Sequence, residues 1–137
     1  MSNTASSSGV MAGKKGLIMG VANDRSIAWG IAAKLAEQGA ELAFTFQGEA
    51  LQKRVEPLAA SVGSDLVIPC DVTDEARMDA TFDVLKERWG SLDFVLHAIA
   101  YSDKEELKGG YVDTSRDNFA RTMDISVYSF TDVARRA

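Results

Sequence analysis

The chain has 137 residues, enough for one domain, and its 46% hydrophobic and 26% charged residues fit a protein with a packed core. The net charge of −5, with no long block of one sign, argues against nucleic acid, which attracts a basic stripe. The sequence contains no run of about 18 apolar residues, the length that would predict a membrane span. The single cysteine, Cys70, excludes an internal disulfide and fits a reducing, cytoplasmic compartment.

Residues 1–13 differ in composition from the rest of the chain. They are rich in Ser, Ala and Gly, and they lack the basic and apolar regions of a secretory signal. We expect a flexible leader over residues 1–13 and one domain over residues 14–137.

From residue 14 onwards, short apolar runs alternate with helical patterns. Predicted strands cover residues 15–19, 41–46, 66–68 and 92–97. Predicted helices cover residues 26–38, 50–62 and 74–89, and a fourth helix begins near residue 114. We expect Thr73 to cap the third helix and Pro57 to kink or restart the second.

Each predicted helix carries apolar residues at helical spacing. The residues are Ile27, Ile31 and Leu35 with Ala28 and Ala32 beside them; Leu51, Val55, Leu58 and Val62; Met78, Phe82, Leu85 and Trp89; and Phe119, Met123, Ser126, Phe130 and Val133. Alternating strands and helices with mostly short connections predict an α/β fold with a parallel sheet. Right-handed crossovers predict a Rossmann-type half with strand order 3-2-1-4, which binds its ligand beyond the carboxyl ends of the strands.

The turn after the first strand is the first candidate binding element. Gly20 allows a sharp turn without a side chain, and the next helix begins after five intervening residues, at Ser26. The Ser26 hydroxyl and the N–H groups of Ser26 and Ile27 are placed to bind a pyrophosphate at the helix N-terminus. The alternative interpretation is an ordinary strand–helix turn in which Ser26 is only an N-cap.

The ends of the second and third strands carry candidate adenosine contacts. Gln47 can donate and accept hydrogen bonds to a ribose or an adenine, although it can equally be a solvent-facing loop residue. The 2′-phosphate of NADPH would prefer a neighbouring cation, and no arginine adjoins Gln47, so NADH is favoured over NADPH. The Asp71 carboxylate can accept a hydrogen bond from the adenine amine, with the Val72 backbone beside it; alternatively, Asp71 caps the following helix.

Small residues follow the fourth strand. Ala98, Ile99 and Ala100 allow the backbone to approach a nicotinamide ribose, and Ser102 could line a substrate pocket or belong to a loop. The single histidine, His97, is assigned a structural role, since no set of metal ligands accompanies it.

Taken together, these motifs resemble the NADH-dependent enoyl-acyl-carrier-protein reductases of bacterial fatty-acid synthesis, a divergent branch of the short-chain dehydrogenases. The matching segments are 20–22, 26–30, 39–45, 70–72, 97–100 and 124–130. The resemblance implies that Gly20, Ser26 and Ile27 hold the pyrophosphate. It also implies that Gln47, Asp71 and Val72 lie on the adenosine side of the cofactor, that Ala98, Ile99 and Ala100 lie on the nicotinamide side, and that Ser102 contacts the acyl substrate.

The resemblance also implies a catalytic tyrosine and lysine separated by six residues, and these are expected beyond Ala137. Tyr101 and Lys108 have that spacing, but they lie in the loop after the fourth strand and are rejected. The 137-residue piece is therefore expected to be an inactive, truncated cofactor-binding half of an enzyme that acts on acyl-carrier-protein-linked substrates and forms homotetramers. Two alternatives stay open at this point: a carbonyl-reducing short-chain dehydrogenase and a non-catalytic NAD-binding module.

Overall fold

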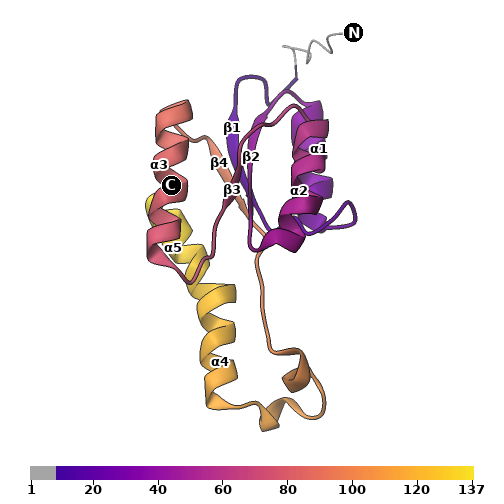
Figure 1. Cartoon of the computed structure of the whole chain (residues 1–137), viewed down its shortest axis with the longest axis vertical. Coiled ribbons are helices and arrows are strands. Elements are labelled where there is room, and N and C mark those ends of the chain that lie inside the picture. Colours follow the sequence, from indigo (N-terminus) through magenta and orange to yellow (C-terminus); the bar gives the residue numbers. More distant parts are fainter. Residues whose placement is uncertain (1–8) are drawn as a thin grey trace.

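The computed structural model describes residues 9–137, and its centre is a four-stranded sheet (Figure 1). The strands are β1 (Lys15–Met19), β2 (Glu41–Phe46), β3 (Val67–Pro69) and β4 (Phe94–His97). All neighbouring strands are parallel and their order is β3-β2-β1-β4. The predicted fold class and strand order are confirmed.

Helices cover both faces of this sheet. On one side lie α1 (Ile27–Glu37) and α2 (Glu49–Ser61); on the other lie α3 (Glu75–Trp89) and α5 (Ser129–Arg136) (Figure 1). The right-handed β–α–β crossover requires this arrangement: the chain passes over one face when it moves from β1 to β3, and over the other when it moves on to β4.

The connection from β4 to α5 forms a lobe beyond the carboxyl edge of the sheet (Figure 1). It holds two short 3₁₀ helices, η1 (Lys104–Leu107) and η2 (Tyr111–Asp113), and the helix α4 (Arg116–Met123). A π-helical turn, η3 (Asp124–Tyr128), joins α4 to α5 without a break in the helix. The predicted single helix is therefore three consecutive segments.

Two apolar clusters, one on each face of the sheet, are formed by side chains of the strands and of the helices that cover them. The cluster on the α1–α2 side includes Phe44, Val55 and Ala59, and the cluster on the α3–α5 side includes Met78, Leu85 and Val133. Strand residues point alternately into the two clusters, as the two-residue period of a strand requires. The strands are thus covered on both faces, which explains their nearly continuous apolar composition.

The buried face of α1 differs from the face with the largest side chains. Ile27 is 81% exposed and Ile31 is 40% exposed, whereas Ala28 and Ala32 are buried against the sheet, with Leu35 partly buried beside them. The expectation of a face centred on the isoleucines is therefore wrong. Alanine side chains let the helix approach the strands closely, and the 3.6-residue period allowed either face.

Three further local predictions need correction. The side chain of Asp74, rather than that of Thr73, caps α3 by accepting a hydrogen bond from the Arg77 N–H. The helix α2 continues through the exposed Pro57 as one element, so the restart expected there is wrong, while a kink stays a prediction. Of the apolar face predicted for the last helix, only Val133 is buried. The exposed members are Phe119, Met123 and Phe130.

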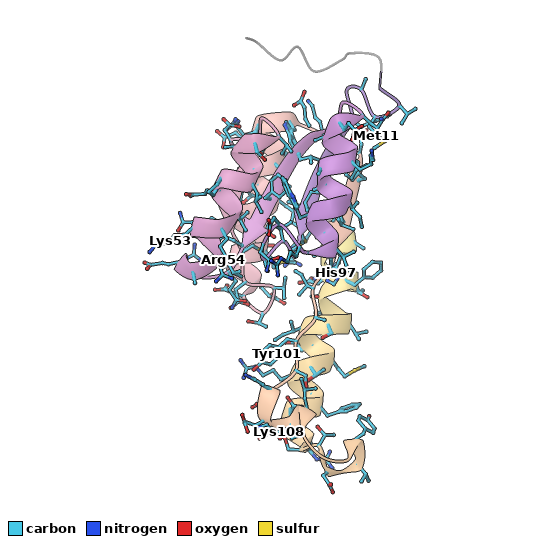
Figure 2. The ribbon with its side chains drawn as sticks, turned by 90° about the vertical axis from the view of Figure 1, so that its right-hand side faces the viewer. Met11, Lys53, Arg54, His97, Tyr101 and Lys108 are labelled. Carbon is cyan, nitrogen blue, oxygen red and sulfur yellow. The ribbon has the colours of Figure 1, made fainter. Side chains whose placement is uncertain are left out.

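Part of the predicted leader packs against the domain. The Met11 N–H donates to the Gln38 carbonyl at the end of α1 (3.0 Å), and the Met11 side chain lies against the α1–α2 cluster (Figure 2). Residues 1–8 lie outside the described part of the chain, so a flexible leader stays a prediction there. In the described residues, the packed region begins before Lys14.

Candidate functional site

The turn after β1 brings two strand ends into close contact. Gly20 has a φ of +109°, and a Cβ atom at this position would lie only 2.0 Å from the Ala98 carbonyl oxygen. Only glycine suits both this backbone angle and this space. The turn therefore exposes backbone rather than side chain at the point where β1 and β4 end.

Ser26 organises the rest of this turn. Its Oγ accepts hydrogen bonds from the N–H groups of Ala22 (2.9 Å) and Asn23 (3.1 Å), so the hydroxyl faces back into the turn and makes no N-cap bond to α1. The Ser26 N–H donates to the Asn23 carbonyl (3.2 Å) and is not free for a phosphate, contrary to the sequence-based expectation. The Ser26 hydroxyl proton stays available for donation to a ligand.

The N-terminus of α1 retains donors of its own. The Ser26 carbonyl accepts the first helical hydrogen bonds, from Trp29 and Gly30, so the N–H groups of Ile27 and Ala28 precede the helical ladder. These groups and the helix dipole make the start of α1 suitable for an anion. In the described residues Ile27 can contribute through its backbone, while its side chain faces outward.

Gln47 and Asp71 meet at the ends of β2 and β3. The Gln47 amide Nε2 donates to Asp71 Oδ2 (3.1 Å), while Asp71 Oδ1 accepts from the N–H and the hydroxyl of Thr73 (2.9 and 2.6 Å). These hydrogen bonds orient the carboxylate at the edge of the sheet. The next residue, Val72, is half-buried against the α3–α5 cluster. This coupling of Gln47 to Asp71 cannot be read from the sequence, because 24 positions separate the two residues.

A crevice of about 200 Å³ lies between these strand ends. It joins predicted site residues from three separate segments with several residues that the sequence patterns did not single out. Its lining residues are Gly20, Val21, Ala22, Thr45, Phe46, Gln47, Leu51, Cys70, Ala98, Ile99 and Ala100. Its volume is below the roughly 300–1,000 Å³ of typical ligand pockets, so it would enclose only part of a ligand as large as a dinucleotide.

The missed lining residues are of two kinds. Val21 and Ala22 directly follow Gly20, so their place in the turn was a usable signal. Thr45 is a buried polar residue within the apolar run Leu42–Phe46, which was a second signal. Leu51 carried no such signal, since its spacing in the second helix equally fits a core residue.

Ser102, the predicted substrate contact, lies outside this crevice and belongs to the lobe. Its Oγ accepts a hydrogen bond from the Asn118 side chain (3.2 Å). Tyr101 and Lys108, the rejected catalytic pair, lie in the same lobe (Figure 2). Arg121 stacks over the Tyr101 ring (4.7 Å to its centroid), and Lys108 forms an ion pair with Glu105 (2.9 Å). Tyr101 and Lys108 thus interact with different partners, Arg121 and Glu105.

Cys70 and His97, the single cysteine and the single histidine of the chain, are both partly or fully buried. Burial raises the pKa of the Cys70 thiol, so the reactive thiolate is disfavoured. Burial likewise lowers the pKa of His97, whose Nε2 lies 2.8 Å from the Ser129 hydroxyl. Within residues 9–137 no cluster of three or more His, Cys, Asp or Glu side chains could hold a metal ion, and no helix is long and apolar enough to cross a membrane.

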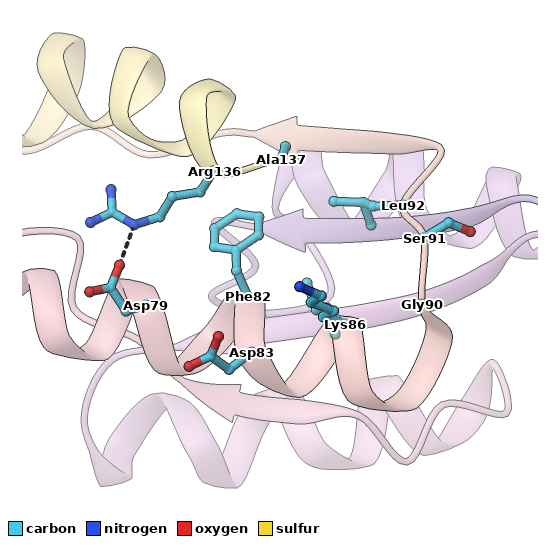
Figure 3. Close-up of a pocket in the computed structure, with 10 residues that line it drawn as sticks. Asp79, Phe82, Asp83, Lys86, Gly90, Ser91, Leu92, Arg136 and Ala137 are labelled. Atoms are coloured by element: carbon cyan, nitrogen blue, oxygen red, sulfur yellow. Dashed lines mark hydrogen bonds and ion pairs between the residues drawn. The ribbon is translucent and has the colours of Figure 1, made fainter.

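A larger cavity, of about 590 Å³, lies elsewhere in the molecule (Figure 3). It is bounded by α3, by residues 90–92 before β4 and by the end of α5, where Arg136 forms an ion pair with Asp79 (2.9 Å). This position is at the amino end of β4. Ligands of doubly wound sheets bind at the opposite, carboxyl ends of the strands, so we assign the site to the smaller crevice.

Comparison with known proteins agrees with this geometry. The family model described as enoyl-(acyl carrier protein) reductase matches residues 20–137. The chain belongs to this family. Across residues 20–137 it therefore shares the architecture of enoyl-(acyl carrier protein) reductases, and the resemblance predicted from the motifs is confirmed.

Individual members of the enoyl-(acyl carrier protein) reductase family are closely similar. A curated enoyl-[acyl-carrier-protein] reductase [NADH] 2 from Rhizobium meliloti is 69% identical over 94% of this chain and 48% of its own length. The crystal structure of FabI from Candidatus Liberibacter asiaticus matches at a TM-score of 0.92 and 59% identity, over 94% of this chain and 50% of the other. An Anaplasma phagocytophilum reductase in complex with NAD matches at a TM-score of 0.91 and 59% identity, over 94% and 49%. The chain spans about half the length of these relatives.

Proposed function

We propose that this chain is the cofactor-binding half of an NADH-dependent enoyl-acyl-carrier-protein reductase. The reaction would reduce the 2,3-double bond of enoyl thioesters during fatty-acid elongation. The observation that carries the proposal is the convergence of the Gly20 turn and the ends of β2, β3 and β4 at one crevice, with Ser26 at the start of α1 hydrogen-bonded to Ala22 of its lining. Membership of the family supports the proposed reaction. The name of a 69% identical relative, which specifies NADH, supports the proposed cofactor.

The pyrophosphate of the cofactor would lie at the start of α1. The Ile27 N–H and the Ser26 hydroxyl proton would donate to it, and Gly20 would let the backbone approach closely. The structure fits such a group, because the first N–H groups of α1 precede the helical ladder. When bound, the nicotinamide would supply the hydride that adds to the substrate.

The adenosine side of the cofactor would lie over Gln47, Asp71 and Val72. The hydrogen bond between Gln47 and Asp71 presents an amide and a carboxylate together, which suits the ribose hydroxyls and the adenine amine. The nearby cations Lys53 and Arg54 are exposed on α2 (Figure 2). No arginine adjoins Gln47 in the sequence, which supports NADH rather than a cofactor with a 2′-phosphate.

The nicotinamide side would lie along Ala98, Ile99 and Ala100, and the acyl chain would reach Ser102 in the lobe. The catalytic tyrosine and lysine implied by the family are expected beyond Ala137, so residues 1–137 alone would bind the cofactor without turnover. We further propose that the full-length enzyme is a cytoplasmic homotetramer that takes its enoyl group from acyl-carrier protein. Residues 14–137 would form the cofactor-binding domain, with residues 1–13 as its leader.

The test uses the protein at its full natural length and the variant Ser26→Phe. A bulky side chain at this position would displace the turn and block the anion site, so we expect NADH to bind at least about tenfold more weakly, since charge-assisted hydrogen bonds contribute about 1.5–3 kcal/mol. Fluorescence titration with NADH measures this effect. Ser61→Phe, at the exposed far end of α2, is the control and should bind NADH normally.

Substrate assays of the wild-type protein separate the candidate functions. We expect NADH oxidation with a 2-enoyl thioester and none with a simple ketone. Oxidation with the ketone alone would instead indicate a carbonyl reductase. NADH binding without turnover of either substrate would indicate a binding module, and unchanged NADH affinity in Ser26→Phe would remove Ser26 from the site.

A further inference from the structure

The π turn η3 is placed beside the segment that follows β4. The Ser129 N–H donates to the Asp124 carbonyl five residues earlier, which makes this turn wider than an α-helical turn. Such turns are rare and occur frequently at functional sites. Ser126 lies within this turn and Ser129 directly follows it, and their hydroxyls contact Tyr101 and His97, the two ends of the segment after β4.

Ser126 holds the far end of that segment. Its Oγ accepts a hydrogen bond from the Tyr101 N–H (3.0 Å) and donates to the Tyr101 carbonyl (3.2 Å). One hydroxyl thus satisfies both backbone groups of a single residue. The stacking of Arg121 over the Tyr101 ring adds a second contact, from α4, which continues directly into η3. The position of Tyr101 is therefore set by side chains of α4 and η3.

Ser129 holds the near end of the segment. Its Oγ donates to the Ile125 carbonyl (2.5 Å) and lies 2.8 Å from His97 Nε2, at the end of β4. A hydroxyl has one proton, and the Ser129 hydroxyl uses it to donate a hydrogen bond to the Ile125 carbonyl. The Ser129 oxygen is therefore the acceptor toward His97, which assigns a proton to His97 Nε2 as the donor of that hydrogen bond. Ser129 is 1% exposed, and the His97 ring also makes a T-shaped contact with the Phe130 ring, with 5.5 Å between their centroids.

Between these two anchors lie Ala98, Ile99 and Ala100, which line the crevice. The Ala98 N–H continues the sheet by donating to the Met19 carbonyl (3.0 Å). In the described residues, the backbone groups of Ile99 and Ala100 make no hydrogen bond. Apart from the packing of the Ile99 side chain against the α3–α5 cluster, their position therefore depends on what holds His97 and Tyr101.

We propose that Ser126 and Ser129, presented together by the π turn, are positioning residues that hold the two ends of the 98–100 segment and thereby set the nicotinamide half of the cofactor site. This inference rests on the proposed function, because it assigns Ala98–Ala100 to the nicotinamide side. It predicts an effect on one half of the ligand only, since Gln47 and Asp71 belong to the other half.

The test compares Ser126→Ala, Ser129→Ala and Ser126→Thr in the protein at its full natural length. We expect each alanine variant to bind NADH about fivefold more weakly, the factor that corresponds to one net hydrogen bond of about 1 kcal/mol. Binding of 5′-AMP, which lacks the nicotinamide, should change by less than about twofold on the same basis. Ser126→Thr keeps the hydroxyl and should restore NADH binding. Thr131→Ala, an exposed hydroxyl deletion on α5, is the matched control.

Amide hydrogen exchange provides a readout that needs no ligand. In Ser126→Ala the Tyr101 amide loses its acceptor, so exchange of the Tyr101 amide should accelerate at least about fivefold relative to Thr131→Ala. Wild-type binding of NADH with unchanged exchange and affinity in Ser126→Ala overturns the inference. Equal weakening of NADH and 5′-AMP also overturns it, because the serines would then stabilise the whole fold. If the wild-type protein binds neither ligand, the proposed function fails, and the exchange rates alone decide whether the serines hold the segment.

Discussion

Replacement of Gly20 by alanine tests the contact on which the crevice depends. The new Cβ would lie 2.0 Å from the Ala98 carbonyl oxygen and 2.6 Å from its carbon, well inside the 3.4 Å at which ordinary contact begins. Both atoms belong to the backbone, so no side-chain rotation can relieve the overlap. The ends of β1 and β4 must therefore separate, and the 98–100 segment must move with them.

Two effects contribute to the expected loss of stability. The φ of +109° is unfavourable for any residue with a Cβ, and a left-handed conformation costs about 1–2 kcal/mol. Overpacking against a fixed backbone adds about 1–3 kcal/mol. The total of about 2–5 kcal/mol is a large part of the roughly 5–15 kcal/mol that is typical of a folded domain.

Two other glycines separate these effects. Gly90 has a φ of +75° but nothing within 4 Å of a built Cβ, so Gly90→Ala carries only the backbone term of about 1–2 kcal/mol. Gly30 is an exposed residue within α1 with open space around it, so Gly30→Ala should stabilise the helix by about 0.5–1 kcal/mol.

Thermal unfolding by circular dichroism should rank the variants of the full-length protein. We expect Gly20→Ala to melt lowest, Gly90→Ala next, and Gly30→Ala at or above the wild type. NADH titration should show weakened binding for Gly20→Ala alone, because only that substitution moves the crevice. A Gly20→Ala protein that melts no lower than Gly90→Ala would refute the close contact between β1 and β4.

Two further predictions concern α5 and His97. The Asp132 side chain is 3% exposed and pairs with Arg135 and Arg136, so Asp132→Ala should lower the free energy of unfolding by about 1.5–3 kcal/mol in urea titrations, the range for hydrogen bonds to charged groups; the exposed Asp83→Ala on α3 should change it little, and equal losses would contradict this reasoning. Burial lowers the pKa of His97 below its ordinary 6.5, so the unfolded state takes up a proton first and stability should fall as the pH drops below 6.5. In melts between about pH 5 and 7, His97→Gln should lose this part of the pH dependence. Asp65 and Glu106, whose pKa values are lowered from 3.8 and 4.5, contribute mainly at lower pH and equally in both proteins, so they cancel in the comparison. An identical pH profile in the variant would show that His97 is not responsible.

The general architecture followed from local sequence patterns. Apolar runs such as Leu17–Met19 alternate with amphipathic helices, and the handedness of the crossovers restricts the possible strand orders to few. Parallel strands then bring their carboxyl ends to one edge, so the order of the elements was enough to predict that Gly20, Gln47 and Ile99 meet there. Helix ends were less certain, because Thr73 and the neighbouring Asp74 are both good capping residues.

Other features depend on how the elements pack. The sequence of α1 offers both an isoleucine face and an alanine face, and only the short distance to the sheet selects Ala28 and Ala32 for burial. The width of the turn at Asp124–Tyr128 and the hydrogen bond from Gln47 to Asp71 likewise have no local signature.

From its residues alone, the chain therefore determines the order of its strands and the edge at which a ligand would bind, because hydrophobic periodicity and backbone handedness act locally. Only the tertiary structure decides which donors are already occupied, which helix face is covered and which serines hold the crevice, because these properties arise between segments that are distant in the sequence.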